Sequence, residues 1–284
     1  PTRLPALSRR PRPRHPNLNT MRFLTNALKG REPLLIDPSR AADHAEAAAS
    51  AGALEETLKM VFGSKPEAYK AGRVGVIPLK GVIGKGLSRL EALTGGADVD
   101  EFEDYLDRME EDEEVTVIVI DISSPGGTVT GVEEIAARVA NSKKPTVAFT
   151  ATEAASAAYW IGASADRFVA TPSSTVGSIG VYMAIPDYSK AFDMAGVRMD
   201  VIKSGSLKGA GIPGTSLSDA QRADLQEQVN AIHAEFRASV RNKRRLVKDE
   251  DMEGQVFSGR QAAAKGLVTG LGTNLAALVA ELNG

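Results

Sequence analysis

The chain has 284 residues, of which 43% are apolar and 25% charged, and its formal net charge is −2. These values are typical of a soluble globular protein and give no electrostatic reason to expect nucleic acid or an anionic membrane as a partner. The absence of cysteine excludes disulfides and thiolate metal sites and fits a reducing compartment. We therefore expect a cytoplasmic protein with no metal and no other cofactor. No apolar run approaches the roughly 18 residues of a membrane span.

The composition divides the chain into three segments. Residues 1–20 contain five prolines and five arginines and no acidic residue, which predicts a disordered basic leader rather than a folded element. Residues 21–70 include an alanine-rich stretch at 40–60 and are predicted to form a helical accessory segment. The patterns of a packed domain begin near residue 71 and continue to residue 284.

Strands and helices alternate through the first part of this domain. A strand is predicted over 73–84, with a bend at Pro78, and an apolar run over 115–120 predicts a strand buried on both faces. Further strands are predicted over 146–151 and 167–170. Helices are predicted between these strands, one with an apolar face and one that begins with a capping box at Thr130–Glu133. The apolar face of the first helix comprises Val99, Phe102, Leu106 and Met109. This alternation predicts an α/β fold of right-handed βαβ units around a mostly parallel sheet.

The second part begins with a strand-like stretch at 200–205. A capping box at Ser218–Gln221 then starts a long helix, and another at Ser258–Gln261 starts a short helix that ends at Gly266. The long helix has an apolar stripe, which we expect to be buried. It comprises Leu225, Val229, Ile232 and Phe236.

Two neighbouring strands of the predicted sheet end in unusual sequence. One is followed by "SSPGG" at 123–127 and the other by "EAASAA" at 153–158. Ligands of parallel sheets bind beyond the carboxyl ends of the strands. The glycines can present free backbone N–H groups to a developing oxyanion, and Ser156 at a strand-to-helix junction can serve as a nucleophile. An ordinary turn and a helix cap are the alternative interpretation.

A serine nucleophile needs a base. The three histidines, His15, His44 and His233, lie neither at a strand end nor at a glycine-rich turn, which disfavours a Ser-His-Asp triad. A lysine is the remaining candidate, although removing the proton of an ordinary lysine at pH 7 costs about 4 kcal/mol. Lys203 and Lys208 lie in the glycine-bounded stretch 201–214, and spacing alone does not choose between them.

Five motifs in order resemble the signal peptide peptidase A family of Ser–Lys proteases, which includes soluble head-maturation proteases of tailed phages. They are "SSPGG", "AASAAYW", "TPSSTVGSIGV", "IKSGSLKG" and "VFSGRQAAAKGLV", and the resemblance spans residues 73–272. It implies a fold of the Clp-protease and crotonase type, a spiral of βαβ units. It also implies that residues 71–284 are a Ser–Lys protease domain that cleaves a peptide or protein substrate.

The resemblance implies a role for each of six residues. Ser156 would be the nucleophile, Lys208 the general base, and Ser178 the hydroxyl that orients the lysine. The oxyanion would be held by the N–H groups of Gly127 and Ala157, with Gly126 shaping the turn. Many relatives have glycines where Ala157 and Ala158 follow the nucleophile here, and a polar residue in place of Gly209; we expect tighter access rather than lost activity.

The resemblance also implies a homo-oligomer with active sites near the interfaces between protomers, and it leaves open whether Lys208 acts within its own chain or on a neighbouring protomer. Three alternatives remain open at this point. The chain could be a catalytically inactive scaffold or assembly protein of the same fold, a bacterial peptidase that degrades signal peptides, or a crotonase-like acyl-CoA enzyme that needs neither Ser156 nor Lys208.

Overall fold

The computed structural model describes residues 34–36, 66–88, 91–92 and 94–284. The predicted leader, 1–20, and most of the predicted accessory segment, 21–70, lie outside these residues, and both remain predictions. The described part of the accessory segment contains strand β1 (Leu34–Ile36) and the start of β2 (Tyr69–Ala71).

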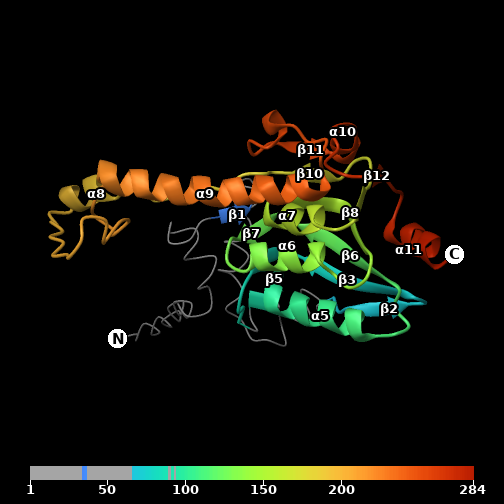
Figure 1. Cartoon of the computed structure of the whole chain (residues 1–284). Coiled ribbons are helices and arrows are strands. Elements are labelled where there is room, and N and C mark those ends of the chain that lie inside the picture. The colour runs from blue at the N-terminus through green and yellow to red at the C-terminus, as the bar shows by residue number, and fades with distance from the viewer. Residues whose placement is uncertain (1–33, 37–65, 89–90, 93) are drawn as a thin grey trace, which may run out of the picture.

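The larger of two sheets runs through the centre of the molecule (Figure 1). Within the described residues it has eight strands, in the order β11-β10-β8-β6-β3-β2, with β9 beside β8 and β12 beside β9. Besides β2, these strands are β3 (Val74–Lys80), β6 (Val117–Ser124), β8 (Thr146–Ala155), β9 (Arg167–Ala170), β10 (Thr175–Gly177), β11 (Val256–Ser258) and β12 (Gly270–Leu271). All neighbours are parallel except the pairs β2–β3 and β10–β11, so the predicted α/β class with a mostly parallel sheet is confirmed.

The smaller sheet has the order β1-β7-β4-β5 in the described part of the chain. Its strands β4 (Val82–Gly84) and β7 (Gly126–Thr128) follow closely on β3 and β6 of the larger sheet, and β5 (Gly96–Asp98) directly precedes α5. Strands β4, β5 and β7 are parallel to one another, whereas β1 is antiparallel to β7. The glycines that the sequence placed in a turn are therefore themselves part of a strand.

Helices cover both faces of the larger sheet. The helices of the described residues include α5 (Val99–Glu111), α6 (Val132–Ala140), α7 (Ala157–Ala163), α8 (Ser189–Met194), α9 (Asp219–Lys243), α10 (Gly259–Ala264) and α11 (Leu275–Asn283), with a 3₁₀ turn at Asp249–Asp251. Of these, α8 and the first half of α9 extend beyond the sheet (Figure 1). Alternate residues of β6 point to opposite sides: Ile118 packs in the cluster that contains α5, α6 and α7, and Val119 in the one against α11. The prediction that this strand is buried on both faces is confirmed.

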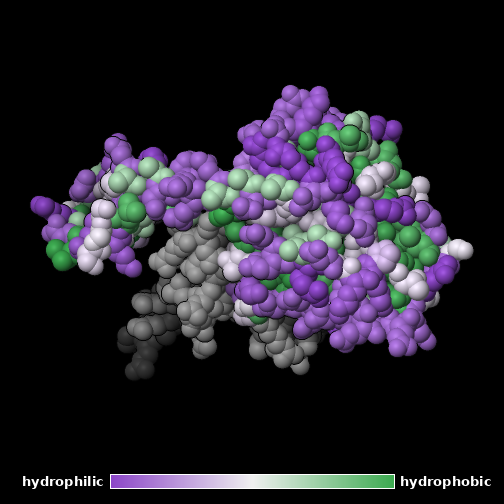
Figure 2. Space-filling view, in the orientation of Figure 1, coloured by the Kyte–Doolittle hydropathy of each residue, from purple (hydrophilic) through white to green (hydrophobic). Residues whose placement is uncertain are grey.

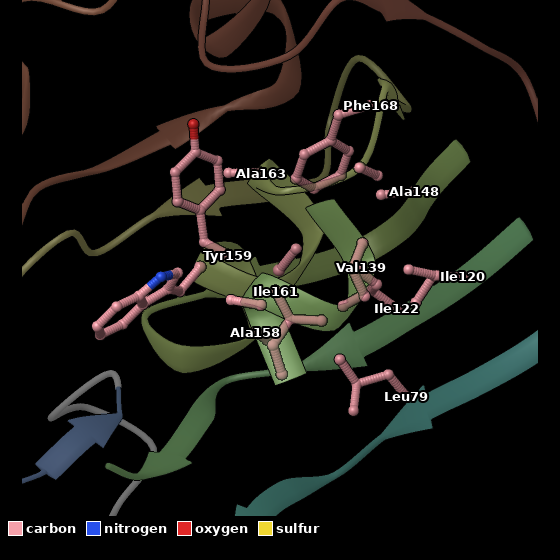
Figure 3. Packing of buried hydrophobic residues seen from close by; sticks show 14 of the residues in the cluster. Leu79, Ile120, Ile122, Val139, Ala148, Ala158, Tyr159, Ile161, Ala163 and Phe168 are labelled. Carbon is pink, nitrogen blue, oxygen red and sulfur yellow. The ribbon is translucent and has the colours of Figure 1, made fainter. Parts of the chain in front are cut away.

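Helix α7 occupies the centre of the main cluster (Figure 3), and all its residues are buried. Ala158 and Ile161 lie among side chains of the sheet such as Leu79 and Ile122. On its other side, the ring of Trp160 stacks on Phe236 of α9, with centroids 4.6 Å apart and planes at 6°.

Four predictions about the elements need correction. The first strand runs through Pro78 and is interrupted at Gly81 instead, where φ is +91°. The predicted capping box at Thr130–Glu133 is wrong: α6 begins at Val132, its N-cap is Gly131 in the left-handed region, and no side chain caps it. The stretch 200–205 is not a strand, because it lies on a projection away from both sheets and has no strand to pair with (Figure 1). Helix α11 was not predicted.

The apolar stripe of the long helix is only partly buried. Phe236 is fully buried, whereas Leu225, Val229 and Ile232 are half-buried. The reason is visible in Figure 1: the first half of α9 extends beyond the body of the molecule together with α8. We call residues 182–230 the arm. Both capping boxes predicted for the C-terminal helices, at Ser218–Gln221 and Ser258–Gln261, are confirmed.

Candidate active site

Ser156 stands between the end of β8 and the start of α7 with φ 55° and ψ −121°. Among the described residues other than glycine, only Ser156 and Ser178 have a positive φ. Such a conformation costs of order 1–3 kcal/mol and persists only where the surroundings impose it. Both of these strained serines were singled out from the sequence.

The sheet holds the two serines side by side. Ala155 of β8 is opposite Gly177 of β10, so Ser156 and Ser178 are the next residues of two paired parallel strands. The N–H of Ser156 donates to the carbonyl of Gly177 at 2.8 Å, and the N–H of Ser178 donates to the carbonyl of Gln255 at 2.7 Å. These bonds fix both turns at the carboxyl edge of the sheet, where ligands of parallel sheets bind.

An irregularity in the pairing of β6 with β8 directs the chain towards this position. Ile122 is opposite Thr150, but Ser124 is opposite Ala154, so three residues of β8 face one residue of β6. The side chains of Thr152 and Ser123 bridge the irregularity with a 2.7 Å hydrogen bond. Bulges of this kind bend a strand and re-aim the residues that follow it.

Strand β7 lies against α7 and contains the two glycines of the "SSPGG" motif. Gly126 has φ +102°, and a Cβ on Gly127 would lie 1.9 Å from the carbonyl oxygen of Ile83 in β4. The first position therefore needs glycine for its conformation and the second for its space. The N–H of Gly126 also donates to Ser124 Oγ at 3.2 Å. The sequence reasoning assigned no role to Ser124, although it belongs to the same motif.

The first turn of α7, directly after Ser156, has free backbone N–H donors. No side chain caps this helix, and the N–H groups of its first turn, including that of Ala157, have no partner within the helix. Ala157 and Ala158 are fully buried, so larger side chains would not fit there without displacing their neighbours. The first turn can thus offer a backbone N–H to an anion in a confined space.

Hydrogen bonds from buried side chains hold α7 and the residues that follow it. Tyr159 Oη donates to the carbonyl of Leu267 at 2.9 Å, and Arg244 Nη2 donates to that of Ala165 at 2.6 Å. Burial raises the pKa of Tyr159 well above its ordinary value, so its phenol remains a donor at every physiological pH. Burial lowers the pKa of Arg244, whose guanidinium remains charged. The candidate nucleophile therefore precedes a rigid helix.

The hydroxyl of Ser156 is enclosed. Ser156 is 1% exposed, and its Oγ has no hydrogen-bond partner among the described residues. A buried hydroxyl normally has a partner, because an unpaired one costs about 1–3 kcal/mol. The unpaired hydroxyl of Ser156 therefore has the capacity to bond with a group that the described part of this single chain does not supply.

Both candidate lysines lie on the arm. Lys208 is exposed in the stretch between α8 and α9, and Lys203 Nζ donates to the carbonyl of Ser206 at 2.9 Å. Since Ser156 Oγ has no partner, neither amine forms a hydrogen bond with it in the single chain. His233 lies on α9 and pairs through Nε2 with the carbonyl of Met252, and His15 and His44 lie outside the described residues.

The arm carries exposed apolar side chains, and Figure 2 shows them among hydrophilic ones. The large ones are Tyr188, Met194, Val197, Met199, Ile202 and Leu207. Ile202 is 97% exposed and Met194 87%.

The described part of the chain lacks two other kinds of feature. We find no grouping of three or more histidine, aspartate or glutamate side chains placed to bind a metal ion. We also find no helix there with the length and apolar content of a membrane span.

The chain was then compared with known proteins. The model of peptidase family S49 matches residues 138–283, just over half of the chain, a range that includes Ser156, Ser178 and Lys208. MJ0651 of Methanocaldococcus jannaschii, named as a candidate protease, is 34% identical over 61% of this chain and 57% of its own length. The capsid assembly protease C of phage lambda is 31% identical over 68% of this chain and 45% of its own length.

Among solved structures, an enoyl-CoA hydratase from Shewanella pealeana aligns with a TM-score of 0.46 and 10% identity over 81% of this chain and 76% of that one. The chain spans about half the length of the two curated relatives above. The family match covers the strained serine, the helix after it and the arm in one continuous segment. The chain belongs to peptidase family S49.

Proposed function

We propose that this chain is a serine endopeptidase in which Ser156 is the nucleophile and Lys208 the general base. The observation that carries the proposal is the conformation of Ser156, a buried, strained serine between a sheet edge and the first turn of a buried helix. Strain of this kind gathers at active sites because it holds a reacting group in position. The membership in a peptidase family supports the same reaction.

The proposed reaction is acyl transfer. Ser156 Oγ attacks the carbonyl carbon of a peptide bond while its proton passes to the neutral amine of Lys208. The N–H groups of Gly127 and Ala157 hold the oxyanion of the tetrahedral intermediate. The resulting ammonium protonates the leaving amine, and a water molecule, activated by the same amine, hydrolyses the acyl-enzyme. Ser178, next to Ser156 across the sheet, is proposed to orient the amine.

We further propose that Lys208 comes from a second copy of the chain. In the single chain it is exposed on the arm, and Ser156 Oγ has no partner. An arm that docks its apolar side chains on a neighbouring copy would carry its lysine out of water, and desolvation favours the neutral amine that a base requires. The site would then be complete only in a homo-oligomer.

The substrate is proposed to be a peptide or protein. One relative, from phage lambda, is named a capsid assembly protease, and another, from Salmonella typhi, is named Protease 4. The reaction that both names describe is the hydrolysis of peptide bonds, and this is the reaction that we propose. Hydrolysis distinguishes it from an inactive scaffold of the same fold.

The test is active-site labelling together with hydrolysis. We expect a fluorophosphonate to label Ser156 and no other residue, and Ser156→Ala to lose both labelling and peptide cleavage without a change in melting temperature. Ser164→Ala is the matched control, because Ser164 is equally buried at the other end of α7. Wild-type cleavage by the Ser156→Ala protein would overturn the proposal.

A further inference from the structure

Strand β1 is antiparallel to β7, the strand that contains Gly126 and Gly127. Leu34 is opposite Thr128, Leu35 opposite Gly127 and Ile36 opposite Gly126. In the order β1-β7-β4-β5, β1 is the outermost strand, and without it β7 would be the edge of the sheet. Figure 1 shows this short strand beside β7.

An unpaired strand edge is a site for adding an extended peptide. Its free N–H and C=O groups form main-chain hydrogen bonds with any segment that lies along it. A peptide substrate could lie along this edge and bring a carbonyl close to Gly127. Residues 34–36 already lie there, opposite both glycines of the proposed oxyanion site.

The exposure of the nucleophile agrees with an occupied site. Ser156 is 1% exposed, so an external peptide cannot reach its hydroxyl in this arrangement of the chain. Two other parts of the site belong to the packed body of the fold: α7 is entirely buried, and Gly127 packs directly against the backbone of β4. Among the described residues, strand β1, by contrast, pairs with β7 alone.

From these observations, and resting on the proposed function, we infer that Leu34–Ile36 is an internal competitor of the substrate. It occupies the edge of β7 as a substrate strand would, and an external peptide binds only when β1 leaves. The ligand of this edge is an extended peptide with free main-chain donors and acceptors. The activity of the full chain is therefore limited by its own N-terminal segment.

The test replaces the backbone donors of β1. Successive N–H groups of a strand point to opposite sides, so Leu35→Pro/Ile36→Pro removes one donor towards β7 whichever residue supplies it. The matched control is Leu35→Ala/Ile36→Ala, which keeps both N–H groups. We expect the proline pair to raise kcat/KM for a fluorogenic peptide, and the rate of fluorophosphonate labelling, at least tenfold. The alanine pair should stay within about threefold of the wild type.

A binding measurement separates this inference from the proposed function. A labelled synthetic peptide of residues 31–40 is titrated into full-length Ser156→Ala protein with and without the proline pair. We expect at least tenfold tighter binding when the prolines are present, whether or not the chain hydrolyses peptides. Tighter binding without hydrolysis or labelling in any variant would support the exchangeable strand and overturn the proposed function.

Equal kcat/KM and equal peptide affinity with and without the prolines would overturn the inference, even in an active enzyme. Melting curves show whether the proline pair disturbs the fold. If it melts well below the wild type, the single variants Leu35→Pro and Ile36→Pro repeat the experiment. Only the proline variant at the residue whose N–H faces β7 should raise activity. Equal effects of the two single variants would show that the pairing of β1 with β7 is not the cause.

Discussion

Two short helices of this protein have nearly the same length and opposite surroundings. Helix α7 has seven residues, all buried, whereas α8 has six residues, none of them buried. The first lies between the sheet and α9 and follows the candidate nucleophile. The second is on the arm, which bears the candidate base (Figure 1).

The difference between the two helices indicates which candidate residues a single chain holds in place by its own packing. The small residues of α7 let it enter the core, so Ser156 and the backbone donors are positioned by packing within the chain. No residue of α8 is buried, and six large apolar side chains of the arm are exposed. Exposed apolar surface of this kind marks an interaction site. On the proposed function, the body is complete in the single chain and the arm contacts a second copy.

The largest expected effect concerns the arm's lysines. Lys208→Ala should lower kcat/KM for peptide hydrolysis by 10²–10⁴-fold, the usual contribution of a general base. Lys203→Ala, five residues away on the same exposed stretch, should stay within about twofold. Equal losses in both variants would remove the distinction between the two lysines.

Mixing inactive variants tests whether body and arm come from different chains. Ser156→Ala protein supplies an intact arm, and Lys208→Ala protein supplies an intact serine. If the lysine acts between chains, co-refolding the two should restore activity, to roughly a quarter of the wild-type value for random pairing. No recovery in a mixture that has exchanged subunits would show that both groups act within one chain.

The next effect concerns the body. Trp160→Ala should destabilise the protein by about 3–5 kcal/mol, because it removes a fully buried ring that stacks on Phe236. Met194→Ala on α8, where the side chain is 87% exposed, should change the unfolding free energy by less than about 0.5 kcal/mol. Urea unfolding measures both. A comparable loss from the Met194 variant would mean that the arm is packed in solution.

A smaller effect concerns assembly. Ile202→Ser on the arm should weaken self-association about tenfold, the effect of losing about 1.4 kcal/mol of apolar burial, and leave the melting temperature of the dissociated chain unchanged. Leu246→Ser is the control, because Leu246 is 81% exposed but lies on the body. Sedimentation at several concentrations measures the association. The same weakening in both variants would exclude the arm as the specific contact.

The smallest effect concerns order within the arm. Asp187 accepts hydrogen bonds from the N–H of Ser189 and the hydroxyl of Ser216, and the bonds to Ser189 and Ser216 lower its pKa to about 2. Because the folded pKa lies below the ordinary value, the stabilisation is present above about pH 4 and is lost as the pH falls towards 2. Asp187→Ala at pH 7 should therefore speed hydrogen exchange in residues 187–218 a few-fold.

The control for this measurement is Asp193→Ala, an exposed aspartate on α8. It should leave exchange unchanged, and exchange in α7 should be the same in all three proteins. Faster exchange in α7 after the Asp187 change would mean that the arm and the body are coupled within one chain.

Much of the site could be predicted from the sequence because its signals are local. A buried apolar run that ends at glycines, and a serine among alanines at the start of a helix, are visible without knowledge of contacts, and both lie where expected. The strain at Ser156 and Ser178 could not be read in this way. It arises from the pairing of β8 with β10 and from the hydrogen bond to Gln255, which is far away in the sequence.

The errors of prediction have the same origin. The pattern at 200–205 is strand-like, but a strand needs a partner, and this stretch lies on the arm. The stripe of α9 has helical periodicity along its whole length, but only its second half reaches the core. Periodicity shows that a face is apolar without showing whether the same chain covers it.

By itself, the sequence determined the α/β class, the main strands of the parallel sheet and the chemical groups of the candidate site, because hydrophobic period, capping residues and glycine-rich turns act over a few residues. Only the tertiary structure decided that Ser156 and Ser178 are neighbours, that β1 lies along the glycine strand, and that the lysines are held away from the serine. These relations depend on which distant segments pack together, and that choice is made by the whole core rather than by any local stretch of the chain.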